Sequence, residues 1–147
     1  PFMSIQKATL HELESLTELF DLYRVFYEQT SDPGRAREFL RERLTKGESV
    51  VFMAFDEGNP IGFVQLYPSF SSVSMMRSWV LNDLFVKESA RKKGFGEELL
   101  NAAIAFARET GAKGVSLETG QDNVKAQRLY EKIGFARESN HFYYFTI

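Results

Sequence analysis

The chain has 147 residues, 44% of them hydrophobic and 26% charged, which is typical of one globular domain. It has no cysteine and only two histidines, which excludes disulfides, thiolate metal sites and a cysteine nucleophile and argues against a multi-histidine metal site. The net charge of −2 lacks the basic surplus of nucleic-acid-binding proteins, and no apolar run is long enough to span a bilayer. We therefore expect one domain over residues 3–147 in the cytoplasm, with no nucleic-acid or membrane partner and no metal. Pro1 and Phe2, which precede Met3, are expected to be additions to the natural chain.

Two helices are predicted in the first third of the chain. Thr9 and Glu12 form a capping box, and apolar side chains follow at helical spacing, so a helix is expected over about 10–28. Asp32-Pro33 is typical of a helix start, and a second helix is expected from there to about Lys46.

The hydrophobic period then changes to that of strands. We expect strands over residues 50–55, 61–68, 78–86, 115–119, 135–139 and 141–147. Two further helices are expected, one from a glycine-rich loop at 94–96 to Gly111 and one over 123–133. The order strand, loop, helix, strand in the middle of the chain is a crossover, which implies two neighbouring parallel strands.

The glycine-rich loop has the pattern R-x-x-G-x-G, formed by Arg91-Lys92-Lys93-Gly94-Phe95-Gly96. Glycines let backbone N–H groups approach a ligand closely, and a helix N-terminus carries unpaired N–H groups and partial positive charge. The pattern therefore favours a phosphate, although taken alone it also fits a solvated charged turn. It matches neither a nucleoside-triphosphate loop nor, because position 99 is leucine, a dinucleotide-binding loop.

A second motif lies downstream of this loop and consists of Asn123, Ala126, Tyr130, Gly134 and Phe135. The two motifs in this order resemble the GNAT superfamily of N-acetyltransferases, which bind acetyl-coenzyme A. The stretches NDLFV and YRVFYEQTSD further resemble the branch that contains the yeast-type histone/polyamine and the diamine acetyltransferases. The resemblance covers the chain from about residue 4. It implies an α/β (α+β) fold with a mixed, mostly antiparallel twisted sheet of six to seven strands, a central splayed parallel pair and about four helices.

The resemblance also implies a binding site for acetyl-CoA as co-substrate. The loop would wrap the pyrophosphate with its N–H groups, and the main chain of 84–86 would pair with the pantetheine arm. Asn123 would reach a pantetheine amide, and Ala126 would leave room for the arm. The expected cofactor-binding residues are Leu84, Phe85, Val86, Arg91, Lys92, Lys93, Gly94, Phe95, Gly96, Glu97, Asn123, Ala126 and Tyr130.

Because no cysteine can carry an acetyl group, we expect direct attack of an amine on the thioester in a ternary complex. Tyr130 is expected to be the acid that protonates the leaving thiolate, although the same residue would also suit aromatic packing. Diamine acetyltransferases have a glutamate where this chain has Asn82, which cannot accept a proton. Asp83 is therefore expected to be the base, acting through a water, or else a half-buried strand residue. His141 is a further candidate.

The amine acceptor is expected at the end of the first long helix. Phe26, Tyr27, Glu28 and Asp32, together with Asn82, would give aromatic walls and carboxylates, which suit a small polyamine- or amino-acid-like cation. Core packing by the aromatic residues and helix capping by Asp32 are the alternatives. The C-terminal HFYYFTI would be a sticky edge if exposed, so a homodimer is expected.

Three other functions stay open at this point. The protein could acetylate lysine side chains or N-termini of proteins, and the sequence does not define the acceptor groove that separates these activities. It could also be a coenzyme A-binding sensor without turnover. The presence of Tyr130 argues against the sensor, whereas Asn82 keeps it open. A nucleic-acid-binding module fits worst, because of the net charge.

Overall fold

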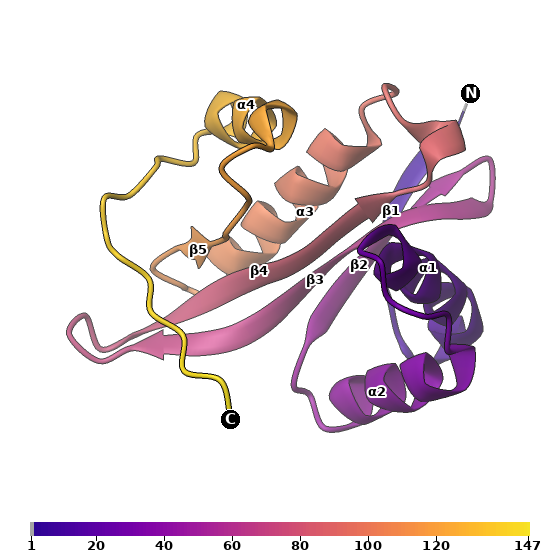
Figure 1. Ribbon diagram of the computed structural model, residues 1–147, viewed down its shortest axis with the longest axis horizontal. Coiled ribbons are helices and arrows are strands. Elements are labelled where there is room, and N and C mark those ends of the chain that lie inside the picture. The colour runs from indigo at the N-terminus through magenta and orange to yellow at the C-terminus, as the bar shows by residue number, and fades with distance from the viewer. Residues whose placement is uncertain (1) are drawn as a thin grey trace.

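A five-stranded sheet in the order β1-β2-β3-β4-β5 runs through the middle of the molecule (Figure 1). The computed structural model describes residues 2–147, so Pro1, one of the two residues expected to be additions, lies outside the described residues. Four strands pair antiparallel, and the fifth pairs parallel to its neighbour. The strands are β1 (Met3–Lys7), β2 (Val50–Asp56), β3 (Asn59–Ser71), β4 (Met76–Val86) and β5 (Val115–Ser116).

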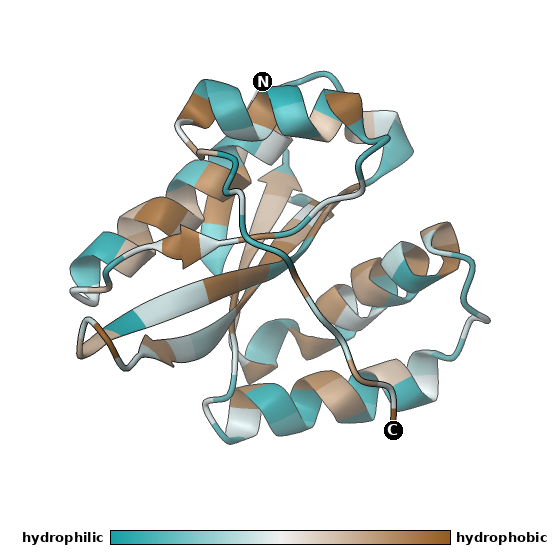
Figure 2. Ribbon diagram, turned by 60° about the vertical axis from the view of Figure 1, so that its left-hand side comes forward, coloured by the Kyte–Doolittle hydropathy of each residue, from teal (hydrophilic) through white to brown (hydrophobic). Residues whose placement is uncertain are grey.

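Helices cover both faces of this sheet, as Figures 1 and 2 show. On one face, α1 (Leu13–Phe26), which follows a short 3-10 turn at Leu10–Glu12, and α2 (Pro33–Thr45) bury a cluster that includes Leu16, Leu40 and Phe63. On the other face, α3 (Phe95–Glu109) buries a second cluster. That cluster includes Leu66, Leu99 and Leu100, and α4 (Val124–Ile133) packs against it. A second 3-10 turn, Glu88–Ala90, precedes the glycine-rich loop. The four α-helices confirm the expected number.

The expected number of strands was wrong, because the sheet has five strands and not six to seven. Residues 135–139 and 141–147 form no strand within the described chain, and β5 has two residues where five were expected. β5 pairs only with Trp79 and Val80. A strand of two residues offers few backbone groups with which residues 135–147 could pair. We did not predict β1 from the sequence; all five of its residues pair antiparallel with residues 52–56 of β2.

A β-bulge at Asn82 interrupts β4. Gln65 pairs with Asp83 and Leu66 pairs with Leu81, so Asn82 has no partner on β3. Side chains alternate along a strand, and the extra residue therefore turns Leu81 toward α3 while Asp83 faces α1. The pairing of β4 with β5 has already ended at Val80, so the bulge lies where the parallel pair opens. The resemblance to N-acetyltransferases implied a splayed parallel pair in the centre of the sheet.

Candidate active site

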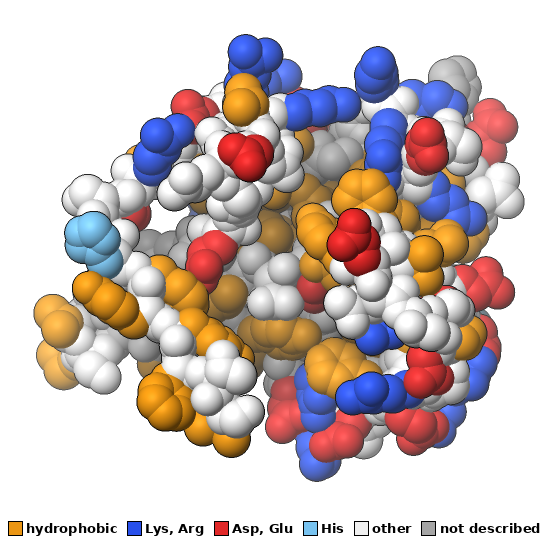
Figure 3. All heavy atoms as spheres, in the orientation of Figure 1, with side chains coloured by type: hydrophobic (Ala, Val, Ile, Leu, Met, Phe, Trp, Pro, Cys, Tyr) orange, Lys and Arg blue, Asp and Glu red, His pale blue; other side chains and the backbone are white. Residues whose placement is uncertain are grey.

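Two adjoining cavities lie where β4 and β5 stop pairing. The first, which we call the loop cavity, has a volume of about 420 Å³ and lies between the glycine-rich loop, the end of β4 and the start of α4. The second, which we call the strand cavity, has a volume of about 490 Å³ and lies between the bulge in β4 and residues 117–120. Tyr27, Leu84 and Asn123 line both cavities, so they form one continuous depression. Figure 3 shows the molecule hollowed between α4 and the end of α1.

The loop cavity contains most of the residues expected to bind the cofactor. Eleven of those thirteen residues line it, and the two that do not are Lys93 and Tyr130. Lys93 lies 3.9 Å from a carboxylate oxygen of Asp56 and points away from the cavity lining. Tyr130 lines the strand cavity instead.

The backbone of the glycine-rich loop is shaped to present N–H groups. Lys92 and Gly94 have φ angles of 65° and 86°, in the left-handed region, and successive turns of this kind make a concave set of N–H groups. Gly94 is the N-cap of α3, and no side chain caps this helix end. The first bond of the helix runs from the Glu98 N–H to the Gly94 carbonyl at 3.1 Å. The N–H groups of the preceding helical turn therefore have no helical acceptor and can receive an anion.

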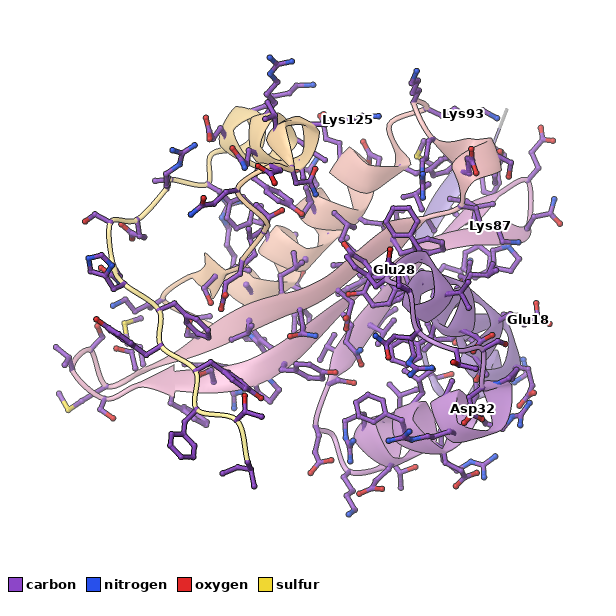
Figure 4. The ribbon with its side chains drawn as sticks, in the orientation of Figure 1. Glu18, Glu28, Asp32, Lys87, Lys93 and Lys125 are labelled. Carbon is purple, nitrogen blue, oxygen red and sulfur yellow. The ribbon has the colours of Figure 1, made fainter. Side chains whose placement is uncertain are left out.

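The two cavities carry opposite charge. Arg91, Lys92 and Lys125 line the loop cavity, and none of the three forms an ion pair with another residue in the described chain. Its lining includes one acid, Glu97, which is neutralised by Lys132 at 2.8 Å. The strand cavity is lined by two carboxylates and, over residues 2–147, by no lysine or arginine. These carboxylates belong to Glu118 and Asp122. Figures 3 and 4 show the basic side chains gathered over α4 and the loop.

Helix α4 positions Asn123 at the junction of the two cavities and Tyr130 in the strand cavity. Asn123 is its N-cap, and the Oδ1 atom accepts the Ala126 N–H at 3.2 Å, which leaves the Nδ2 group free to donate. Gln127 donates to the carbonyls of Gly120 and Gln121 and so fixes the loop that carries the acids. Burial, together with the neighbouring Tyr27, raises the pKa of Tyr130, so its phenol keeps a proton at neutral pH and can donate it.

Asp83 lies behind the wall of the strand cavity and lines neither cavity. Its carboxylate accepts hydrogen bonds from Gln65 Nε2 at 2.7 Å and Asn82 Nδ2 at 3.1 Å, and the Tyr23 hydroxyl also faces it. Burial raises the pKa of Asp83, although these hydrogen bonds offset part of the effect. Asn82 and Tyr23 line the strand cavity and hydrogen-bond to Asp83, so a proton can reach Asp83 past these two side chains or through a water between them.

The residues expected to bind the acceptor are only partly brought together. Tyr27 and Asn82 line the strand cavity, while Phe26 lines the loop cavity. Asp32 accepts the Arg35 N–H at 3.1 Å as the N-cap of α2, and Glu28 is exposed at the end of α1; neither lines a cavity (Figure 4). The other candidate base, His141, is exposed in the segment after α4.

The sequence analysis missed three charged residues of the site. Glu118 and Asp122 follow β5, and Lys125 lies in the first turn of α4. A signal was present for the two acids, because ligands in open α/β sheets bind at the carboxyl ends of parallel strands, where residues 118–123 had to lie. No comparable signal marks Lys125.

Comparison with known proteins identifies the family. The model of the acetyltransferase (GNAT) family matches residues 16–135. The chain belongs to this family. The uncharacterized N-acetyltransferase YhfO of Bacillus subtilis is 46% identical over 142 residues, which cover 97% of this chain and 95% of that protein. A crystal structure of a probable acetyltransferase is 44% identical and matches with a TM-score of 0.90, covering 98% and 96% of the two chains. The protein is therefore a GNAT N-acetyltransferase, and this family uses acetyl-CoA.

Two more distant matches are relevant to the ligands. The D-amino-acid N-acetyltransferase HPA3 of Saccharomyces cerevisiae is 35% identical over 85 residues, 56% of this chain and 53% of that protein. The aminoglycoside N-acetyltransferase AAC(6′)-Iy, solved in complex with CoA, has the same fold with a TM-score of 0.83 at 20% identity, over 99% and 95% of the chains. The narrower resemblance to histone/polyamine and diamine acetyltransferases stays a prediction.

Two further findings concern residues 2–147. Over this range, no helix combines the length and the apolar character that crossing a membrane requires. Nor does any group of three or more His, Asp or Glu side chains in it lie close enough to hold a metal ion.

Proposed function

We propose that this GNAT enzyme transfers the acetyl group of acetyl-CoA to a primary amine of a small cationic acceptor, such as a polyamine or a basic amino acid. The observation that carries this proposal is the pair of adjoining cavities with opposite charge. Three cations that form no ion pair within residues 2–147 suit the phosphates of the cofactor, and two carboxylates suit an ammonium group. Tyr27, Leu84 and Asn123 line both cavities, so the thioester and the amine would meet beside them.

The cofactor would lie along the loop cavity. Its pyrophosphate accepts hydrogen bonds from the N–H groups of the glycine-rich loop and the first turn of α3. The edge of β4 that faces β5 has no ladder partner after Val80, which leaves the main chain of 84–86 open to the amide groups of the pantetheine arm. AAC(6′)-Iy, which shares this fold, was solved in complex with CoA, which supports a CoA site in this fold.

In the proposed reaction the neutral amine attacks the thioester carbonyl, a C–N bond forms and the C–S bond breaks. Tyr130 donates its phenolic proton to the departing thiolate. The proton lost by the amine passes through a water held near Asn82 to Asp83. The raised pKa of Asp83 supports this role, because it makes the carboxylate a stronger base than an ordinary aspartate. Solvent returns the phenolic proton of Tyr130.

The acidic wall of the strand cavity can be tested with two acceptors of similar length, one with additional cationic nitrogens and one without them. We expect Glu118→Gln to raise the KM for spermidine by roughly five- to tenfold, since about 1 kcal/mol of attraction is lost, and to leave the KM for a monoamine of similar length nearly unchanged. Glu109→Gln, which removes the same charge at the end of α3, is the matched control. Equal changes for both amines would contradict the cationic site, and a larger effect of Glu28→Gln would move it to the end of α1.

A further inference from the structure

The guanidinium of Arg91 is held by two aromatic rings at the end of β4. Its Cζ atom lies 5.1 Å from the ring centroid of Phe26 and 6.0 Å from that of Phe85. Its Nε group donates to the Val86 carbonyl at 2.9 Å. Arg91 is half-buried and lines the loop cavity. The side chain is therefore fixed at its Nε end, and its two terminal nitrogens stay free for a ligand.

The position of Phe26 does not fit an acceptor wall. Phe26 lines the loop cavity and not the strand cavity, and its side chain is 56% exposed at the last turn of α1. Its ring contacts Phe85, with centroids 6.4 Å apart, and the guanidinium of Arg91. Phe26 is thus exposed rather than buried in the core, and its ring restricts the orientation of the Arg91 guanidinium beside the glycine-rich loop.

The other cations near the cavity are held differently. Lys92 and Lys125 line the cavity without an aromatic ring or a carboxylate against them in the described chain, and Lys93 leans toward Asp56. Lysine is a flexible point charge, whereas the planar fork of arginine binds phosphate oxygens in pairs when its orientation is set. Fixing Arg91 before the ligand arrives reduces the rotamer entropy that it loses on binding.

We propose that Phe26 determines specificity for the phosphate end of the cofactor, by stacking on Arg91 so that its free nitrogens face the phosphates in the loop cavity. This inference rests on the proposed function, in which the loop cavity holds CoA. It makes Phe26 a positioning residue, since it acts through Arg91. Its consequence is that Phe26 helps the enzyme to distinguish acetyl-CoA from S-acetylpantetheine, a thioester with the same arm and no phosphate.

The test compares kcat/KM for acetyl-CoA and for S-acetylpantetheine in the full-length protein. We expect Phe26→Leu to lower the value for acetyl-CoA by about two- to fivefold, the range of an exposed cation–π contact, and to leave that for S-acetylpantetheine unchanged. Phe26→Tyr keeps a ring face and should restore the preference. Phe70→Leu removes a similar exposed contact, with Arg77 at 4.9 Å, from the β3–β4 hairpin outside both cavities and is the matched control.

A double-mutant cycle with Arg91→Gln separates positioning from a general effect on the fold. Once Arg91 is gone, Phe26→Leu should cost nothing further for acetyl-CoA. Equal losses for both thioesters, or additive losses in the double variant, would overturn the inference. Calorimetry of CoA binding to the unmodified protein keeps the two proposals apart: if CoA does not bind, the proposed function fails first, and if it binds while the cycle is additive, only the role of Phe26 fails.

Discussion

Tyr130 combines the properties that a proton donor to a leaving thiolate needs. It lines the strand cavity, it lies one helical turn before the end of α4, and burial raises its pKa so that the phenol is neutral. We expect Tyr130→Phe to lower kcat by roughly 10²-fold or more, with little change in the KM for either substrate. Steady-state kinetics at saturating acetyl-CoA measure this. Tyr143→Phe, in the exposed C-terminal segment, is the control, and an unchanged kcat in Tyr130→Phe would remove this residue from the reaction.

The raised pKa of Asp83 should make the free energy of unfolding depend on pH. A carboxyl whose pKa is raised by folding binds its proton more tightly in the folded protein, so it contributes most stability below the ordinary aspartate pKa of 3.8. That contribution is lost as the pH rises through the raised value. We expect Asp83→Asn to remove this dependence, so that the variant gains stability relative to the natural protein between pH 4 and pH 7.

The geometry around Asp83 makes this substitution tolerable. Gln65 donates to Asp83 from Nε2, and its Oε1 atom is buried without a hydrogen-bond partner in the described structure. Turning this amide over brings Oε1 toward position 83, where it can accept a hydrogen bond from the new amide group. Urea unfolding of both proteins at pH 4, 5, 6 and 7 gives the two pH profiles of the free energy of unfolding. Parallel profiles would mean that Asp83 titrates as it does in the unfolded chain.

At the scale of elements, the sequence predicted what local chemistry determines. The capping box at Thr9, the Asp32-Pro33 start and the Asn123 cap all appear as helix starts in the structure. The glycine-rich loop could also be predicted from the sequence, because its shape depends on residues adjacent in the chain, above all Gly94 with its φ of 86°. Eleven expected residues accordingly meet around one cavity.

The predictions that were wrong concern strands, which form by pairing between segments distant in the sequence. β1 is short, and its partner strand lies more than 40 residues away, so its own sequence gives little signal. The segment 141–147 has the alternation of a strand, yet it pairs with none of the five strands in the described chain. The opposite charges of the two cavities likewise became visible only after Glu118, Asp122 and Lys125 had been brought beside them by the fold.

At the scale of the whole molecule, the C-terminal segment predicts an assembly. Its large apolar side chains face solvent, with Tyr143 at 87% and Phe145 at 86% exposed, which is unfavourable for an isolated chain. We expect a homodimer in which residues 141–147 pair with a partner copy, and we expect deletion of these residues to give monomers. Sedimentation gives the mass. A single-chain mass for the full-length protein would contradict the dimer. Phe70→Ser, which changes an exposed side chain of the β3–β4 hairpin, should leave the dimer unchanged.

We propose that adjoining cavities of opposite charge bring a CoA thioester to a small cationic amine. The most direct test of this proposal is the release of CoA from acetyl-CoA, followed with a thiol reagent. The protein contains no cysteine and so contributes no background. Spermidine, a monoamine of similar length and a lysine-containing peptide would be compared at equal concentration. We expect release that depends on the acceptor and is fastest with spermidine. Release with the peptide alone, or CoA binding without release for any amine, would contradict the proposal.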